Sequence, residues 1–143
     1  MQENFDYTLV PGRFAHCFHC DCRKAGECLR YQITAFLPTD LRNVTTVNPL
    51  YTPADEGCSY FKSCTPLVYA EGMNRMLADL PYEKANAIKQ RMLAHFGKTH
   101  FYRLKRKERY FTPEDQLVVK RIFQNAGIKE QPQYDAYIER FDW

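Results

Sequence analysis

The sequence has no long hydrophobic run and none of the common catalytic motifs. No apolar stretch approaches the roughly 20 residues of a membrane-spanning helix, so we predict no membrane span. The first residues lack the basic stretch and apolar run of a secretory signal, so we expect a cytoplasmic protein. The motifs GxGxxG, GxxxxGK[ST], GxSxG and HExxH are absent. We therefore predict no catalytic residues, no enzyme activity and no small-molecule substrate.

The composition is that of a folded protein. The 143 residues are 45% hydrophobic and 26% charged, and they include ten Tyr and ten Phe. Such a chain buries enough apolar surface to fold, which excludes a disordered chain. The length suits one domain, or one domain with a small appended module.

The chain separates into a cysteine-rich part and a helical part. Residues 1–66 hold all six cysteines and most of the prolines, and they predict a loop-rich module with a short helix over 27–37 and a short strand over 43–47. Apolar residues at helical spacing then predict four helices, over about 69–80, 83–96, 99–106 and 113–126. Tyr134, Tyr137, Ile138 and Phe141 predict a further helix by the same spacing. We thus expect a mainly α fold in which the module 1–66, with or without a short strand pair, packs on 67–143 as one compact unit.

Four cysteines lie within thirteen residues, in the stretch HCFHCDCRKAGEC of residues 16–28. Zinc binds four thiolates or imidazoles, and a loop-rich segment with little core would gain stability from such a site. We therefore predict about one structural zinc per chain. Burial of the cysteines as small apolar side chains and disulfide or redox chemistry are the alternatives. His16 and His19 are interpreted as loop residues or spare ligands. The spacing of the cysteines does not match a ferredoxin-type iron–sulfur motif.

Positive charge is concentrated in one segment. Residues 84–109 hold nine basic residues and one acidic residue, a local net charge of +8, whereas the whole chain carries +3. Here one predicted helix ends at Gly97 and the next begins near Thr99, which resembles the helix, short turn and helix of a DNA-binding module.

In a helix-turn-helix, the first residues of the second helix contact base edges and flanking cations contact phosphates. Thr99, His100 and Arg103 are therefore our candidates for base contacts. The candidates for phosphate contacts are Lys98, Lys105, Arg106, Lys107 and Arg109. We predict a non-catalytic nucleic-acid-binding protein whose target is DNA. A regulatory role would fit such a protein. Alternatively, the same basic surface serves a protein-interaction or structural adaptor with an acidic protein partner, or is only a solvated face.

Several stretches resemble a small gut-bacterial family that is named only as a domain of unknown function. They are HCFHCDCRKAGECLRY, NPLYTPADEGCSYF, AEGMNRML and FYRLKRKERYFTPEDQLVVKRIF, within about residues 5–128. The cysteines of the family pattern fall on Cys17, Cys22, Cys28 and Cys58, although Ala25 lies one residue later than the pattern suggests. The resemblance therefore implies these four as the metal ligands, with Cys20 and Cys64 as extras. The family implies no activity.

The second half also resembles, more weakly, helix-turn-helix regulators. Thr99 and the run Phe101-Tyr102-Arg103 match a recognition helix of that class, with His100 inserted. This resemblance implies DNA binding through the helix over 99–106.

Overall fold

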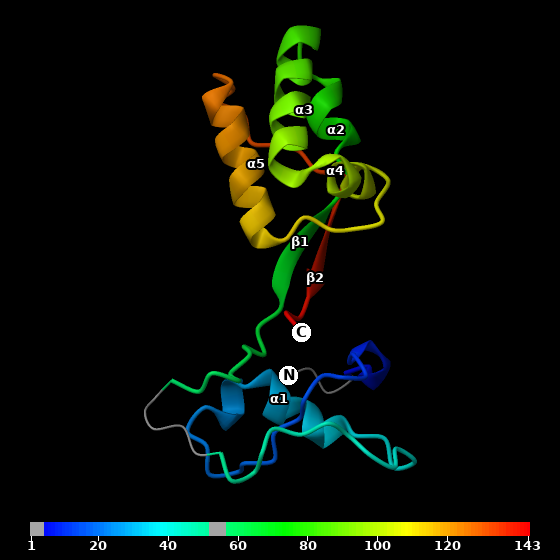
Figure 1. Cartoon of the computed structure of the whole chain (residues 1–143), viewed down its shortest axis with the longest axis vertical. Helices are drawn as coiled ribbons and strands as arrows, with labels where there is room; N and C mark the ends of the chain where they lie inside the picture. The colour runs from blue at the N-terminus through cyan, green and yellow to red at the C-terminus, as the bar shows by residue number, and fades with distance from the viewer. Residues whose placement is uncertain (1–4, 52–56) are drawn as a thin grey trace. The chain divides into compact units, whose positions relative to one another are not determined.

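The computed structural model describes residues 5–51 and 57–143. The chain divides into two compact units, Met1–Pro66 with Phe141–Trp143 (unit 1) and Leu67–Arg140 (unit 2). Unit 1 is largely loops, and unit 2 carries the longer helices and a two-stranded ribbon (Figure 1). The described residues form five α-helices and one two-stranded antiparallel sheet. The expectation of a mainly α fold therefore holds only in part, because the architecture mixes helices and strands.

The described residues of unit 1 form one short α-helix, α1 (Leu29–Gln32), and three 3-10 helices. The 3-10 helices are η1 (Tyr7–Leu9), η2 (Ala25–Glu27) and η3 (Ile33–Phe36). The helix predicted over 27–37 is thus α1 followed directly by η3. The strand predicted over 43–47 is wrong: Thr46 makes only an isolated parallel bridge with His16.

The core of unit 1 is small and aromatic. Phe14, Leu29 and Ile33 are buried, and the chain's last residues pack against them. The ring of Trp143 meets the ring of Phe14 edge-on, with 5.1 Å between centroids. Phe141–Trp143 therefore return to unit 1 from a distant part of the sequence.

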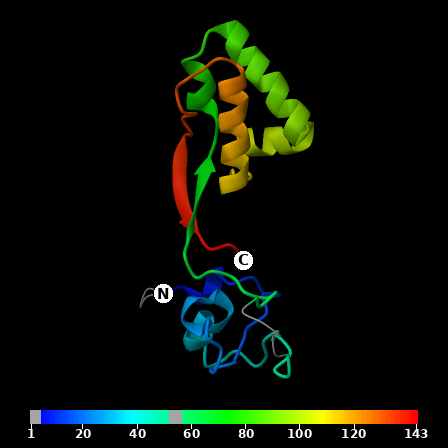
Figure 2. The ribbon, with the colours of Figure 1, turned by 90° about the vertical axis from the view of Figure 1, so that its left-hand side faces the viewer.

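Unit 2 has four helices and the ribbon. They are β1 (Leu67–Glu71), α2 (Asn74–Ala78), α3 (Tyr82–Phe96), α4 (Lys98–Lys105), α5 (Pro113–Asn125) and β2 (Ala136–Arg140). Helix α3 contacts α4 and α5, and α5 contacts β1. The views in Figures 1 and 2 show α4 turning sharply away from the end of α3. The buried core includes Ile88, Phe101, Phe111 and Val119.

The predicted helices over 83–96, 99–106 and 113–126 are confirmed as α3, α4 and α5. Their local signals are strong. Thr112 and Asp115 form a reciprocal capping box at the start of α5, with Pro113 at its first position. Gly127, with a φ of +73°, ends α5: its N–H bonds to Gln124 and the next N–H bonds to Phe123. This is the Schellman pattern, in which a left-handed residue lets the last carbonyls find partners.

Two predicted helices are wrong. Tyr69 and Ala70 lie in β1 and not in a helix, so the element predicted over 69–80 begins as a strand and only α2 is helical. The segment predicted as a helix over 134–141 contains β2, which pairs antiparallel with β1 in a register that places Tyr69 opposite Ile138. Val, Ile and Tyr favour strands, and here they find partners about 70 residues away.

Gly72 and Asp135 explain why strand β1 ends and helix α2 begins shortly after it. Gly72 has a φ of +70°, which ends β1 in a conformation that favours glycine. A Cβ at this position would clash with the Asp135 carboxylate. That carboxylate accepts bonds from the backbone N–H of Arg75 (3.0 Å) and the side chain of Asn74 (3.1 Å), so it caps α2 from across the unit.

None of the helices formed by the described residues has the length and apolar character needed to cross a bilayer.

Candidate nucleic-acid interface

Helices α3 and α4 form the predicted helix pair, with a very short connection. Only Gly97 separates them, and its φ of +74° allows the sharp change of direction. A helix-turn-helix connection is usually three or four residues long. Phe101 and Leu104 are buried as predicted, and they fix which side of α4 faces the core of unit 2.

The predicted binding residues gather on α4 and on the loop that follows it. We call this set the basic surface: Lys98, Thr99, His100, Arg103, Lys105, Arg106, Lys107 and Arg109. Seven of the eight are exposed, and His100 is half-buried. The cationic ends are thus accessible.

One acidic residue, Glu108, partly neutralises the basic surface. Its carboxylate accepts two hydrogen bonds from the Arg106 guanidinium, at 2.6 and 3.2 Å, and lies 3.7 Å from the Arg103 Nε. The bond from Arg106 lowers the pKa of Glu108. Glu108 therefore stays ionised down to more acidic pH than a free glutamate, and the pairs are lost only when pH falls through that lowered pKa.

Lys107 forms an ion pair with Asp135, a residue outside the basic surface. Its Nζ lies 3.6 Å from the Asp135 carboxylate, and its φ is +63°, which is unusual for a residue with a side chain. In contrast, Lys98, Lys105 and Arg109 make no ion pair with any residue that the structure describes. These three cations are therefore the members of the basic surface most available to a ligand.

A shallow hollow of about 300 Å³ opens at the start of α4. It brings together five members of the basic surface. The lining residues are Phe96, Gly97, Lys98, Thr99, His100, Arg103 and Arg109. Arg109, which follows α4 in the sequence, thus lines the same hollow as residues from the first turn of that helix.

His100 lines this hollow but does not point freely into solvent. Its Nε2 is buried and has no hydrogen-bond partner among the described residues, and its ring centroid lies 5.5 Å from that of Phe96. A base-contacting residue must instead extend from the surface of its helix. Among the three predicted base contacts, the structure therefore exposes Thr99 and Arg103 and turns His100 inward.

The six cysteines lie in unit 1 as free thiols. Backbone bonds draw their segments together: Cys17 N–H bonds to the Arg30 carbonyl, and Cys64 N–H bonds to the Glu27 carbonyl. Cys28 is buried, and Cys64 packs on the small core.

The side chains that the structure describes do not form a metal site. Within residues 5–51 and 57–143, no three His, Cys, Asp or Glu side chains are grouped so that they could hold a metal ion. The set Cys17, Cys22, Cys28 and Cys58 is therefore not gathered around one point, and neither are the extras Cys20 and Cys64.

Zinc binding stays a prediction, and elemental analysis of the protein purified under reducing conditions measures it directly. About one zinc per chain is the expected result if the four thiolates act together. A metal-free protein that keeps its free thiols and its stability would contradict this and leave the cysteines to packing.

His16 has a structural role. It is buried, its Nε2 lies 2.8 Å from the Tyr7 hydroxyl, and its Nδ1 lies 3.2 Å from the Thr45 carbonyl. Both ring nitrogens are thus occupied, which supports the interpretation of His16 as a loop residue. His19 is half-buried.

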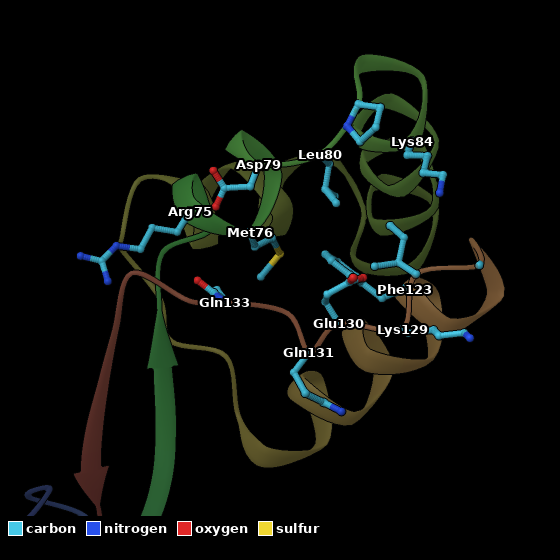
Figure 3. A pocket seen from close by; sticks show the side chains of 13 residues that line it. Arg75, Met76, Asp79, Leu80, Lys84, Phe123, Lys129, Glu130, Gln131 and Gln133 are labelled. Carbon is cyan, nitrogen blue, oxygen red and sulfur yellow. The ribbon is translucent and has the colours of Figure 1, made fainter.

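A second hollow, of about 500 Å³, lies elsewhere in unit 2 (Figure 3). Met76, Leu80 and Phe123 line it, together with cations such as Lys129 and acids such as Glu130. Its lining mixes apolar groups with charges of both signs, so it selects no single ligand chemistry.

The sequence did not point to Asp135, and it singled out Tyr134 only as part of a predicted helix face. Asp135 bonds to α2 and Lys107 through its carboxylate and to Glu71 of β1 through its backbone N–H, and Tyr134 is buried with a hydroxyl that has no partner in the described part of the chain. Burial raises the pKa of the Tyr134 phenol, and the nearby Tyr137 and Asp115 add to this effect. A predicted helix over 134–141 hid both roles, because it placed these residues on the wrong element.

Comparisons with known proteins identify only a family. No curated protein and no solved structure matches the chain. The sequence profile of a family of unknown function, DUF6078, matches residues 1–143, which confirms the resemblance to a domain of unknown function. The chain therefore belongs to the DUF6078 family.

Proposed function

We propose that this protein binds nucleic acid through the basic surface, as a binding protein and not a catalyst. The observation that carries the proposal is the arrangement at the start of α4, where Lys98, Arg103 and Arg109 surround one hollow and none of the described residues that line it is acidic. Phosphate contacts supply most of the affinity of non-specific nucleic-acid binding.

The proposed contacts favour the sugar–phosphate backbone over base edges. Helix α4 has eight residues, and its buried Phe101 and Leu104 hold it against the core. His100 faces inward, and the Arg103 guanidinium lies close to the Glu108 carboxylate. Few of the predicted base-contacting side chains are therefore available to reach a base. We therefore expect weak sequence preference, because backbone contacts carry no sequence information directly.

A salt titration tests the proposal. Labelled duplex DNA is expected to bind with a dissociation constant of about 1–100 µM at physiological salt. Four phosphate contacts, from Lys98, Arg103, Lys105 and Arg109, predict a slope of about −3.6 for log affinity against log salt concentration. Absence of binding at about 50 mM salt, where such contacts are strongest, would reject the proposal.

An acidic protein partner is the second candidate. Glu108 shows that Arg103 and Arg106 already hold a carboxylate on this surface. Competition between labelled DNA and polyglutamate, compared at equal concentrations of charge, separates the two candidates. Displacement of DNA by polyglutamate at equal charge would favour the acidic partner, whereas retention of DNA favours nucleic acid.

A further inference from the structure

We propose that the hollow at the start of α4 binds a single phosphate monoester group. This inference rests on the proposed function for its biological setting, but the hollow itself is defined by the residues that line it. It reassigns Thr99, His100 and Arg103, which the sequence suggested as base contacts, to a phosphate site.

The charge at the hollow suits a dianion. Lys98, Arg103 and Arg109 line the hollow, and none of the described lining residues is acidic, although Arg103 also lies 3.7 Å from the carboxylate of Glu108. A backbone phosphodiester carries one negative charge, whereas a phosphate monoester carries about −1.5 to −2 at pH 7. Two guanidinium groups and one ammonium therefore match a terminal or free phosphate more closely than one link of a strand.

The backbone at the hollow favours the same ligand. Gly97 is the residue that caps α4, and it has no side chain to accept a bond from the first N–H groups of the helix. Those groups have no partner within the helix, and the positive end of the helix dipole lies there. An anion above Thr99 would supply acceptors for them, in the way that helix N-termini commonly bind phosphate.

His100 Nε2, which has no hydrogen-bond partner among the described residues, is a separate observation at the same place. Buried polar atoms in folded proteins almost always have a hydrogen-bond partner, and an exception calls for an explanation. Because His100 lines the hollow, a phosphate oxygen bound there would supply the partner that Nε2 lacks among the described residues. The volume of about 300 Å³ lies at the lower end of the range for small-ligand sites.

Inorganic phosphate is the first probe. We expect addition of phosphate to the full-length protein, at constant ionic strength with chloride as the balancing anion, to shift the backbone amide resonances of Thr99 and His100 in a saturable way. Arg109→Gln should weaken this binding about tenfold, because it removes one charge-assisted contact. Arg121→Gln is the matched control: it removes an equal charge from an exposed position of unit 2 that lies outside the basic surface and outside the hollow, and it should weaken binding less than about twofold.

Lys98→Gln serves as a second variant if Arg109→Gln unfolds, and it should weaken phosphate binding to a similar extent. Absence of a saturable shift with about 20 mM phosphate would overturn the inference. An equal effect of Arg109→Gln and Arg121→Gln would also overturn it, because the response would then follow net charge.

Oligonucleotides with a 5′-phosphate or a 5′-hydroxyl identify the source of the phosphate. A preference for the 5′-phosphate that Arg109→Gln abolishes would assign the hollow to a strand end. Phosphate binding without such a preference would support a free phosphorylated small molecule at the hollow. If phosphate binds and neither oligonucleotide does, the hollow stands and the proposed function fails; if only the oligonucleotides bind, the reverse holds.

Discussion

Changing both Lys98 and Arg109 to Glu is expected to reduce the affinity for duplex DNA by more than about a hundredfold at 0.1 M salt. Each phosphate contact accounts for about eightfold in affinity at this salt concentration, by the usual slope of −0.9 per contact. Two lost contacts account for about sixtyfold, and two negative charges facing the DNA add repulsion. Fluorescence anisotropy with a labelled duplex measures the change.

The matched control for this experiment keeps the same net charge. Arg121 and Lys129 are exposed cations of unit 2 that lie outside the basic surface. Changing both to Glu should reduce affinity only a few-fold. Equal losses in the two double variants would mean that the overall charge drives binding and that the surface at α4 has no special role. Glu is well tolerated at the first turn of a helix, so the Lys98 substitution should leave α4 folded.

Changing Asp135 to Ala is expected to lower the free energy of unfolding by about 3 kcal/mol. The Asp135 carboxylate caps α2 through the Arg75 N–H, bonds to Asn74 and lies 3.6 Å from Lys107. Loss of a helix cap costs about 1 kcal/mol, and hydrogen bonds to a charged group contribute about 1.5–3 kcal/mol. Urea unfolding measures the change.

Asp135→Asn separates the cap from the charge. An asparagine keeps an oxygen acceptor for the Arg75 N–H but loses the attraction to Lys107, so it should recover more than half of the lost stability. If the alanine variant unfolds at the same urea concentration as the natural protein, α2 does not depend on this cap. If the asparagine variant is as unstable as the alanine variant, the stabilising effect of Asp135 comes entirely from its negative charge.

The helices that the sequence predicted correctly have signals contained within a few turns. The capping box of Thr112 and Asp115 and the terminating Gly127 mark the ends of α5, and both act through neighbouring backbone groups. Gly97 likewise marks the boundary of α3 and α4. Since these contacts form between residues close in sequence, the pattern of residue types is enough to predict them.

The ribbon was mispredicted because strand pairing is not local. Tyr134, Tyr137, Ile138 and Phe141 fit helical spacing, yet Tyr137 lies in β2 opposite Ala70 and Phe141 packs in unit 1. A helix satisfies its own backbone, whereas a strand needs a partner strand. Only the folded chain shows that β1 provides that partner.

The sequence alone determined the concentration of positive charge in residues 84–109, the boundaries of the three longest helices, and the buried pair Phe101 and Leu104 on α4. These follow from charge counting and helical periodicity, which need no knowledge of distant contacts. The tertiary structure alone decided that Arg109 lines the hollow at the start of α4, that His100 turns inward there with an Nε2 that has no partner among the described residues, and that Glu108 accepts hydrogen bonds from Arg106. Each of these features depends on where the side chains lie once the chain has turned and packed. The residue type at each position, taken separately, does not determine that placement.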